Sequence, residues 1–269
     1  MKGASLATLL DSRAIECLAY NISQVYPNFA SAAFRKAARR SVEGLGIMPR
    51  GVALAEVLHE FLPPRFDEAA GILVASLGPP LQGTSGHGLA PFFYLPHTRF
   101  VSLYGVNSRY NEGRDPFESA MQAQHEMTRR FTAEFSIRRF LIADPDRTLK
   151  KLLEWTLDPD PHVRRLCSEG TRARLPWAER LPMFIKDPKP TLPILEALKD
   201  DADLYVRRSV ANHIGDIAKD HPALAVKICR GWLRGASAER FWVIRHAMRY
   251  HAKKGQPDAL EVRRLAARR

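Results

Sequence analysis

The second half of the sequence repeats a short pattern in which acidic residues are followed by apolar residues and arginines. Residues 158–165 read DPDPHVRR and residues 200–208 read DDADLYVRR, with the final arginine displaced by 43 positions. A weaker copy, residues 239–245, follows after a further 37 positions. A chain with an internal period near 40 residues is expected to stack similar units along one direction. The repeat places three arginines at equivalent positions, namely Arg165, Arg208 and Arg245.

An apolar segment with helical spacing precedes each copy of the pattern, over residues 149–155, 191–198 and 224–233. Pairs of helices that repeat at this period are typical of HEAT-like arrays, in which the second helices line a concave face. The sequence therefore predicts an all-α fold of HEAT-like helical repeats that form a curved α-superhelix with a concave basic groove.

The first half is also helical in pattern. Apolar residues spaced by three and four predict helices over 27–39, 50–61, 67–77 and 117–141, and no window alternates as a strand would. The glycine- and proline-rich stretch 78–88 predicts a loop. We expect a single HEAT-like repeat domain over 1–269, with an N-terminal helical part (1–88), groove-forming repeats (89–255) and a basic tail (256–269).

The net formal charge of +12 comes entirely from the C-terminal half of the sequence. Residues 1–128 contain 11 Lys/Arg and 11 Asp/Glu, whereas residues 129–269 contain 30 and 18. This imbalance favours a polyanionic partner such as nucleic acid, with a merely soluble basic surface as the alternative. No membrane span or secretory signal is expected. Three widely separated cysteines favour reduced, buried thiols in a cytoplasmic protein.

Polar residues spaced by four form a stripe along each predicted second helix. The predicted helix over 117–141 carries a similar stripe, formed by Glu126, Arg130, Glu134 and Arg138. Ordinary solvated ion pairs explain one such stripe. Stripes that coincide across repeats instead put arginines beside carboxylates on one surface, which suits a phosphate backbone. The stripes of the repeats are Arg165 and Glu169; Arg208, Asn212 and Asp216; and Trp242 or Arg245 followed by Arg249.

Glu169 is expected near a helix end, because Gly170 follows it and Pro176 prevents simple continuation. The basic loop beyond it carries Arg172 and Trp177. Nearby guanidinium groups would keep the Glu169 carboxylate ionised. An exposed Trp177 could pack against a sugar or a base, and the alternative is a tryptophan that fills the core between repeats. Motifs of zinc proteases, phosphate-binding loops and serine hydrolases are missing from the sequence.

At these residues the sequence resembles the DNA alkylation repair family, specifically its AlkC branch. The matching stretches lie at 92–97 (FFYLPH), 130–138 (RFTAEFSIR), 161–172 (PHVRR and SEGTR) and 205–222 (YVRRSVANH and DIAKDHP), and the resemblance extends from about residue 18 to 257. It implies a HEAT-like superhelix that holds damaged duplex DNA. It also implies a monofunctional DNA glycosylase that acts on cationic lesions, chiefly 3-methyladenine and, for this branch, 3-methylcytosine.

The resemblance also assigns residues. It implies that Glu134, Glu169 and Asp216 are acidic groove residues, that Trp177 is the groove aromatic, and that Arg165, Arg172 and Arg208 contact the DNA backbone. The stripes add Asn212, Trp242 and Arg245 as candidate DNA-binding residues. Some members of the branch carry a C-terminal immunoglobulin-like domain, and we expect none here, because residues 256–269 leave no room for it.

A base alkylated at N3 carries a positive charge and leaves without a strong general acid. We therefore expect Glu169, assisted by Glu134 and Asp216, to stabilise the oxocarbenium-like sugar and to orient water, with no metal or organic cofactor. The expected partner is alkylated double-stranded DNA, with no membrane and with the protein as a monomer. The alternatives are a non-catalytic HEAT-like protein that binds bent or damaged DNA, and a protein-interaction scaffold.

Overall fold

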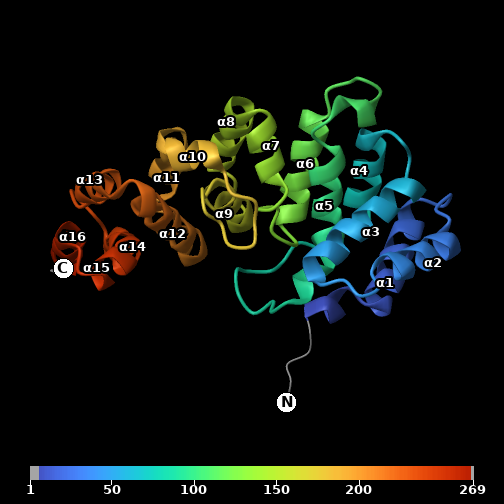
Figure 1. Cartoon of the computed structure of the whole chain (residues 1–269), viewed down its shortest axis with the longest axis horizontal. Helices are drawn as coiled ribbons and strands as arrows, with labels where there is room; N and C mark the ends of the chain where they lie inside the picture. The colour runs from blue at the N-terminus through green and yellow to red at the C-terminus, as the bar shows by residue number, and fades with distance from the viewer. Residues whose placement is uncertain (1–5, 268–269) are drawn as a thin grey trace, which may run out of the picture. The chain divides into compact units, whose positions relative to one another are not determined.

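The computed structural model describes residues 6–267, and every regular element in that range is a helix, without a strand (Figure 1). The predicted all-α class is confirmed. The chain divides into two compact units, Met1–Ala143 and Asp144–Arg269, which are described separately below. No helix within residues 6–267 is long and apolar enough to cross a membrane.

The first unit packs its helices through a core that includes Phe34, Leu54, Phe66 and Phe100, each at most 1% exposed. Residues 78–88 form the predicted loop. The boundary expected at residue 88 does not separate compact units, because α3 packs on α5 and α4 packs on α6 across it. The elements are η1 (Leu6–Leu10), α1 (Ser12–Val25), α2 (Ser31–Ser41), α3 (Ile47–Phe61), α4 (Phe66–Ala75), η2 (Ala90–Tyr94), α5 (Leu95–Tyr104), η3 (Ser108–Asn111), α6 (Phe117–Thr128) and α7 (Ile137–Ala143).

The long helix predicted over 117–141 is wrong, because α6 ends at Thr128 and α7 begins at Ile137. In the intervening turn, side-chain hydroxyl groups form hydrogen bonds with the backbone. The amide of Glu134 donates to Thr132 Oγ1 at 3.2 Å, and Ser136 Oγ donates to the carbonyl of Ala133 at 3.0 Å. Such local side-chain bonds compete with a continuous helix. Glu134 therefore lies on a turn, so it does not continue a stripe along one helix from Glu126 and Arg130.

The second unit contains the predicted helix pairs, α8 with α9, α11 with α12, and α13 with α14. The second helices pack on one another, α9 on α12 and α12 on α14, as expected of a HEAT-like array. The elements are α8 (Pro145–Trp155), α9 (Pro161–Gly170), α10 (Pro182–Lys186), η4 (Lys189–Thr191), α11 (Leu192–Leu198), α12 (Leu204–Asp220), α13 (Pro222–Trp232), α14 (Ala238–Ala247), α15 (Arg249–Lys253) and α16 (Pro257–Ala267).

The repeated sequence pattern sets the start of each second helix. Asp160 caps α9 by accepting from the amide of His162 at 2.9 Å, and Asp203 caps α12 by accepting from the amide of Tyr205 at 2.7 Å. Ser237 caps α14 in the same way, accepting from the amide of Arg240 at 3.2 Å. A capping oxygen satisfies one of the free amides of the first turn. The acidic residues of the repeat therefore have a structural purpose.

The first arginine of each Arg-Arg pair is also structural. Arg164 donates to the carbonyls of Asp158 and Pro159 at 2.8 and 3.0 Å, and Arg207 makes the equivalent bonds in the next repeat. Arg164 Nε also donates to the carboxylate of Asp201 at 2.6 Å, which ties one repeat to the next. Only the second arginine of each pair, Arg165 or Arg208, therefore remains as a candidate for binding.

The segment expected as a basic tail contains helix α16, so that expectation is wrong for residues 257–267. Ala259, Val262 and Ala266 are buried, and the helix packs on α13, α14 and α15. These three positions are spaced by three and four residues, which is the helical period. Arginines between them conceal the pattern in the sequence. The last two residues of the expected tail, 268–269, lie outside the described residues.

Candidate functional site

Packing of α9 on α12 brings together two acidic residues that are far apart in the sequence, Glu169 near the end of α9 and Asp216 towards the end of α12. Both are buried, with relative exposures of 6% and 2%. Arg172, in the turn after α9, lies between them and is 8% exposed. Two buried carboxylates with few compensating groups would destabilise the fold, so the arrangement depends on their partners.

The carboxylate of Glu169 is held at both oxygens. Arg172 Nη1 donates to Oε1 at 2.6 Å, and Arg165 Nη2 lies 3.4 Å from the same oxygen. Ser209 Oγ on α12 donates to Oε2 at 2.6 Å. Burial acts to raise the pKa of Glu169, but the guanidinium groups of Arg165 and Arg172, together with the Ser209 bond, lower it below its usual value. Glu169 is therefore an ionised carboxylate, as the sequence predicted.

Asp216 is bound from two directions. Arg172 Nε donates to Oδ2 at 2.8 Å, and Lys219 Nζ donates to Oδ1 at 2.8 Å. Burial acts to lower the pKa of Arg172, but Glu169 and Asp216 together raise it. Arg172 therefore stays charged and joins the two carboxylates into one network, here called the α9–α12 carboxylate network: Glu169, Arg172, Asp216, Arg165, Ser209 and Lys219.

A buried histidine supports this network. His213 on α12 is fully buried, and its Nδ1 lies 3.0 Å from the carbonyl oxygen of Ser168 on α9. Burial and the nearby Arg172 charge lower the pKa of His213 to about 4, so the ring is neutral at physiological pH. Because a carbonyl oxygen only accepts, Nδ1 carries the proton. The bond fixes α9 against α12 and thereby the separation of the two carboxylates.

The loop beyond α9 presents an aromatic side chain to solvent. Trp177 is 69% exposed and has φ of 63°, in the left-handed region that a bulky residue rarely adopts. The alternative of a tryptophan filling the core is wrong. Arg174, in the same loop, forms a two-point ion pair with Asp220 at 2.8 and 2.7 Å. That pair anchors the loop to the end of α12, and strain held in this way is a frequent feature of functional sites.

The candidate DNA-binding arginines differ in their surroundings. Arg208 is exposed on α12, whereas Arg165 is partly buried and its guanidinium lies over the ring of Tyr205 at 5.2 Å. Arg245 Nη1 donates to the backbone carbonyl of Ala266 in α16 at 2.6 Å, so it holds the last helix. Of the three equivalent arginines, Arg208 presents its charge most openly.

Two further candidates lie near α14. Asn212 Oδ1 accepts from Arg249 Nη2 at 2.8 Å, and the ring of Trp242 is stacked on His246 with centroids 4.7 Å apart. Burial and the nearby Arg249 and Arg208 charges lower the pKa of His246 to about 4. The His246 ring is thus an uncharged stacking partner. Both candidate side chains therefore already contact other residues of the second unit, Asn212 contacting Arg249 and Trp242 contacting His246.

The remaining acidic candidate, Glu134, belongs to the first unit. It lies on the turn between α6 and α7, is 8% exposed, and its Oε2 accepts from Thr132 Oγ1 at 2.8 Å. Glu126 forms the first predicted pair of that stripe, with Arg130 Nη1 at 2.6 Å. Arg138 is 1% exposed, so it is part of the core.

Sequence reasoning missed Ser209, His213 and Lys219. Their contacts with Glu169, Ser168 and Asp216 depend on how α9 packs on α12, which a helical period does not specify. All three positions lie within the stretches over 205–222 that carry the family resemblance, and that resemblance is a signal that could have pointed to them. The expectation of buried thiols fails for Cys17, which is exposed, and holds for Cys167 and Cys229.

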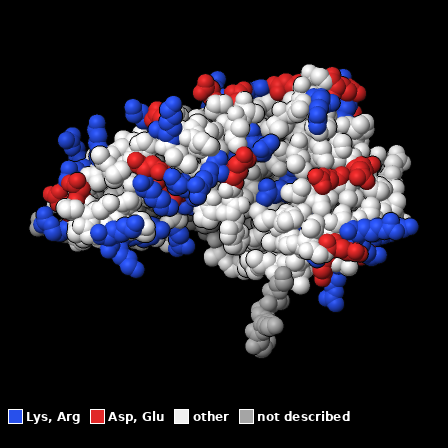
Figure 2. Space-filling model, viewed as in Figure 1, with Lys and Arg blue, Asp and Glu red and all other residues white. Residues whose placement is uncertain are grey.

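The surface of the second unit is basic. Residues 144–269 contain 26 Lys/Arg against 17 Asp/Glu, and Figure 2 shows many of the basic side chains on the face that it draws. Among residues 6–267, no group of three or more His, Cys, Asp or Glu side chains is placed to hold a metal ion. The site offers carboxylates, guanidinium groups and an exposed aromatic ring, which together can bind a polyanion and stabilise a cation within it.

Known proteins resemble this chain in structure and in sequence. The structure resembles that of the Pseudomonas fluorescens alkylpurine DNA glycosylase AlkC bound to DNA containing an abasic site analog, with a TM-score of 0.82 and 35% sequence identity over 96% of this chain and 67% of that chain. The uncharacterised protein YhaZ of Bacillus subtilis (strain 168) is 35% identical over 258 residues, which span 96% of this chain and 67% of YhaZ. No family model matches the sequence.

Proposed function

The chain belongs to the AlkC branch of the DNA alkylation repair family, and we propose that it is a DNA glycosylase that removes N-alkylated bases from duplex DNA. The proposal extends to a monofunctional enzyme that hydrolyses the N-glycosidic bond of cationic bases, namely 3-methyladenine and 3-methylcytosine. It acts as a monomer in the cytoplasm. The observation that carries the proposal is the α9–α12 carboxylate network, in which Glu169 is ionised although it is buried.

Cleavage of the glycosidic bond of a cationic base does not require a strong general acid to protonate the base. Alkylation at N3 makes the base a cation, and the base leaves as a neutral molecule when the glycosidic bond breaks. Positive charge then develops on the sugar, and a fixed carboxylate stabilises it because the charge already stands in place. Glu169 supplies that carboxylate, and Glu134 and Asp216 assist. The same carboxylate orients the water that attacks the anomeric carbon.

Arg172 takes a different part from the phosphate contact that the family resemblance implies. Its guanidinium donates to Glu169 and Asp216 and is 8% exposed, so little of it is available to a phosphate. We assign it a positioning role, in which it bonds to both carboxylates and lowers the pKa of Glu169. Contact with the DNA backbone then falls mainly to Arg208, with Arg165 beside the network.

The exposed Trp177 supplies an apolar surface for a sugar or base next to these charges. Stacking of a base on an aromatic ring contributes about 1–3 kcal/mol in nucleic-acid complexes. Asn212, Trp242 and Arg245 extend the binding surface along α12 and α14. Of these, Asn212 and Trp242 act through partners within the protein, Arg249 and His246.

One observation favours the alternative of a non-catalytic protein that binds damaged or bent DNA. Both carboxylates are already paired, Glu169 with Arg172 and Asp216 with Arg172 and Lys219, as in a purely structural ion network. The two functions differ in what the carboxylate contributes. A glycosylase needs the negative charge of Glu169 in the transition state, whereas a binding protein needs only the fold that the charge helps to hold.

Release of free 3-methyladenine and 3-methylcytosine from methylated duplex DNA tests the proposal, with wild type compared with Glu169→Gln. Glutamine keeps the shape and the bonds from Ser209 and Arg172 but removes the charge. We expect base release to fall by about 10²–10³-fold at saturating enzyme, with DNA affinity and thermal stability retained. Glu154→Gln is the matched control, because Glu154 is exposed on α8.

Three outcomes divide the hypotheses. Loss of release in Glu169→Gln alone, with binding retained, supports the glycosylase and its assignment. Release by both variants at the wild-type rate keeps the enzyme and moves the essential carboxylate to Glu134 or Asp216. Tight duplex binding with no base release by the wild type contradicts the glycosylase and supports the binding protein.

A further inference from the structure

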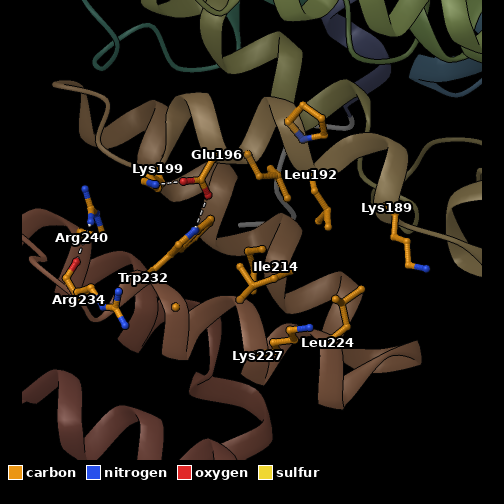
Figure 3. Close-up of a pocket in the computed structure, with 14 residues that line it drawn as sticks. Lys189, Leu192, Glu196, Lys199, Ile214, Leu224, Lys227, Trp232, Arg234 and Arg240 are labelled. Atoms are coloured by element: carbon orange, nitrogen blue, oxygen red, sulfur yellow. Dashed lines mark hydrogen bonds and ion pairs between the residues drawn. The ribbon is translucent and has the colours of Figure 1, made fainter.

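A cavity of about 830 Å³ lies in the second unit among α11, α12, α13 and the start of α14, and the proposed function does not use it (Figure 3). Ile214 of α12 lines this cavity. Asp216 lies two positions further along the same helix, about 200° around its axis, because each residue advances by about 100°. The cavity therefore lies on the side of α12 away from the α9–α12 carboxylate network.

The floor of the cavity is apolar. Trp232 is held in place there, because its Nε1 donates to Glu196 Oε2 at 2.7 Å (Figure 3). The bond satisfies the polar atom of the indole, so the ring presents carbon to the cavity. A cavity of this size falls within the range of sites that bind small molecules or short peptide segments. The floor is formed by Leu192, Leu195, Ile214, Leu224, Ile228 and Trp232.

The rim is strongly basic. Five cationic side chains line the cavity, against the single carboxylate of Glu196. Lys199 is paired with Glu196, and Arg240 Nε donates to Asp200 at 2.6 Å. The other three cations, Lys189, Lys227 and Arg234, form no ion pair within residues 6–267. Three uncompensated positive charges therefore surround an apolar floor.

The dimensions follow from the helices that line the cavity. Lining residues on α13 run from Leu224 to Trp232, eight positions, and those on α11 and its end run from Leu192 to Lys199. At about 1.5 Å per residue this gives a length of about 12 Å. An extended chain advances about 3.3 Å per residue, so about four residues fit along the cavity.

We propose that this basic-rimmed cavity binds a short acidic segment of a partner protein that carries one or two apolar side chains. Charge complementarity selects this ligand. Duplex DNA would use the cations but leave the apolar floor exposed, and a neutral apolar molecule would use the floor but leave the cations uncompensated. Acidic side chains facing Lys189, Lys227 and Arg234, with an apolar side chain on Trp232, satisfy both features.

Such a partner can stay bound while the enzyme holds DNA. The cavity and the carboxylate network lie on different sides of α12, so the two ligands do not compete for one surface. The inference is independent of the proposed glycosylase activity, because it concerns a protein partner and not the chemistry on DNA.

Fluorescence anisotropy with a labelled peptide of four residues, Asp-Asp-Leu-Phe, tests the proposal on the full chain. We expect saturable binding to the wild type. The double variant Lys189→Glu/Lys227→Glu should weaken it by about tenfold or more, because two attractions become repulsions. Lys150→Glu, a single reversal of the same kind on exposed α8, is the control and should alter the affinity less than about twofold.

Peptide variants test the floor without altering the protein. Replacing Leu-Phe by Ser-Ser should abolish detectable binding if the apolar floor is used. Base release from methylated DNA by the double variant should equal that of the wild type, which separates this test from that of the proposed function. The proposal is overturned if the peptide does not bind, if Lys150→Glu weakens binding equally, or if the Ser-Ser peptide binds as well. Competition by unmodified duplex DNA, or binding of dodecanoate in place of the peptide, would also overturn it.

Discussion

The contact between α9 and α12 and the contact between α12 and the α14–α15 segment join equivalent parts of successive repeats, yet they hold different chemistry. Between α9 and α12, Glu169 and Asp216 are buried around Arg172. Between α12 and α15, the polar contact is an exposed hydrogen bond from Arg249 to Asn212. No acidic side chain takes part in that bond.

This difference shows how a repeat fold divides its tasks. The backbone packing of second helices is reused, while the side chains at the contact decide whether it places negative charge or presents cations and amides. Negative charge in a basic surface repels phosphates, so it is retained only where it has a purpose. Under the proposed function, the α9–α12 contact serves the chemistry and the α12–α15 contact serves DNA binding.

Removal of Arg172, the cation that Glu169 and Asp216 share, should have the largest effect on the free energy of unfolding. It should also distinguish the α9–α12 contact from the α12–α15 contact most clearly. Arg172→Ala leaves two buried carboxylates without their common partner, and we expect it to lower the free energy of unfolding by about 3–5 kcal/mol. Arg249→Ala removes an exposed guanidinium and should cost less than about 1 kcal/mol. Urea denaturation of both variants at neutral pH measures the difference. Equal, small losses would show that the network is not stabilising.

The dependence of that loss on pH sharpens the argument. In the wild type the pKa of Glu169 is lowered, so its ionisation adds stability above the unfolded value of 4.5, and this is lost as the pH falls through the lower folded value. In Arg172→Ala the buried carboxyl lacks its guanidinium, which shifts its pKa upward. The stability difference between wild type and variant should therefore shrink as the pH is lowered from 7 to 4. A difference that stays constant would contradict this account.

Loss of an exposed arginine should have a smaller effect, on binding alone. Arg208→Ala should weaken duplex binding and reduce the slope of log affinity against log salt by about 0.9 for each phosphate that the variant no longer neutralises. Base release at saturating DNA should not change. Lys150→Ala, also exposed in the second unit, is the control. Reduced turnover with unchanged affinity would move Arg208 from the binding role to the catalytic one.

Much of the second unit follows from the sequence because its repeat encodes local signals. Capping by Asp160 and Asp203 depends on residues two positions apart, and helical spacing fixes which side chains face the core. The same reasoning failed at residues 129–136, where Thr132 Oγ1 accepts from the amide of Glu134 and Ser136 Oγ donates to the carbonyl of Ala133. The spacing of apolar residues alone does not reveal where side-chain hydroxyl groups compete with the hydrogen bonds of a helix.

The sequence predicted two acidic residues of the network and the arginines near Glu169, but it did not predict the roles of Ser209, His213 and Lys219. Glu169 and Asp216 lie on stripes that a helical period reveals, and the family resemblance points to the same positions. Ser209 and His213 act across the α9–α12 contact, so their roles depend on the rotation of one helix against another. The rotation also places Arg172 between two carboxylates, although the family resemblance implies a phosphate contact for it.

Substitution of two tryptophans, Trp177 in the loop after α9 and Trp242 on α14, should have the smallest effect on stability. Trp177 is exposed at φ of 63°, whereas Trp242 is partly buried and stacked on His246. Asparagine tolerates the left-handed region, so Trp177→Asn should leave the free energy of unfolding unchanged or raise it by up to about 1 kcal/mol. Trp242→Ala should lower it by about 1 kcal/mol, since it loses a stacked pair.

The effect of Trp177→Asn on base release should differ from its effect on stability. Trp177→Asn should weaken productive binding of methylated duplex DNA although the protein is as stable as the wild type, because the variant loses the exposed ring that the proposed function places against the DNA. Thermal unfolding measured together with base release at limiting DNA makes the comparison. If Trp177→Asn destabilised the protein and left base release unchanged, the strained conformation of Trp177 would be a feature of packing, and the binding surface would have to be sought elsewhere on the second unit.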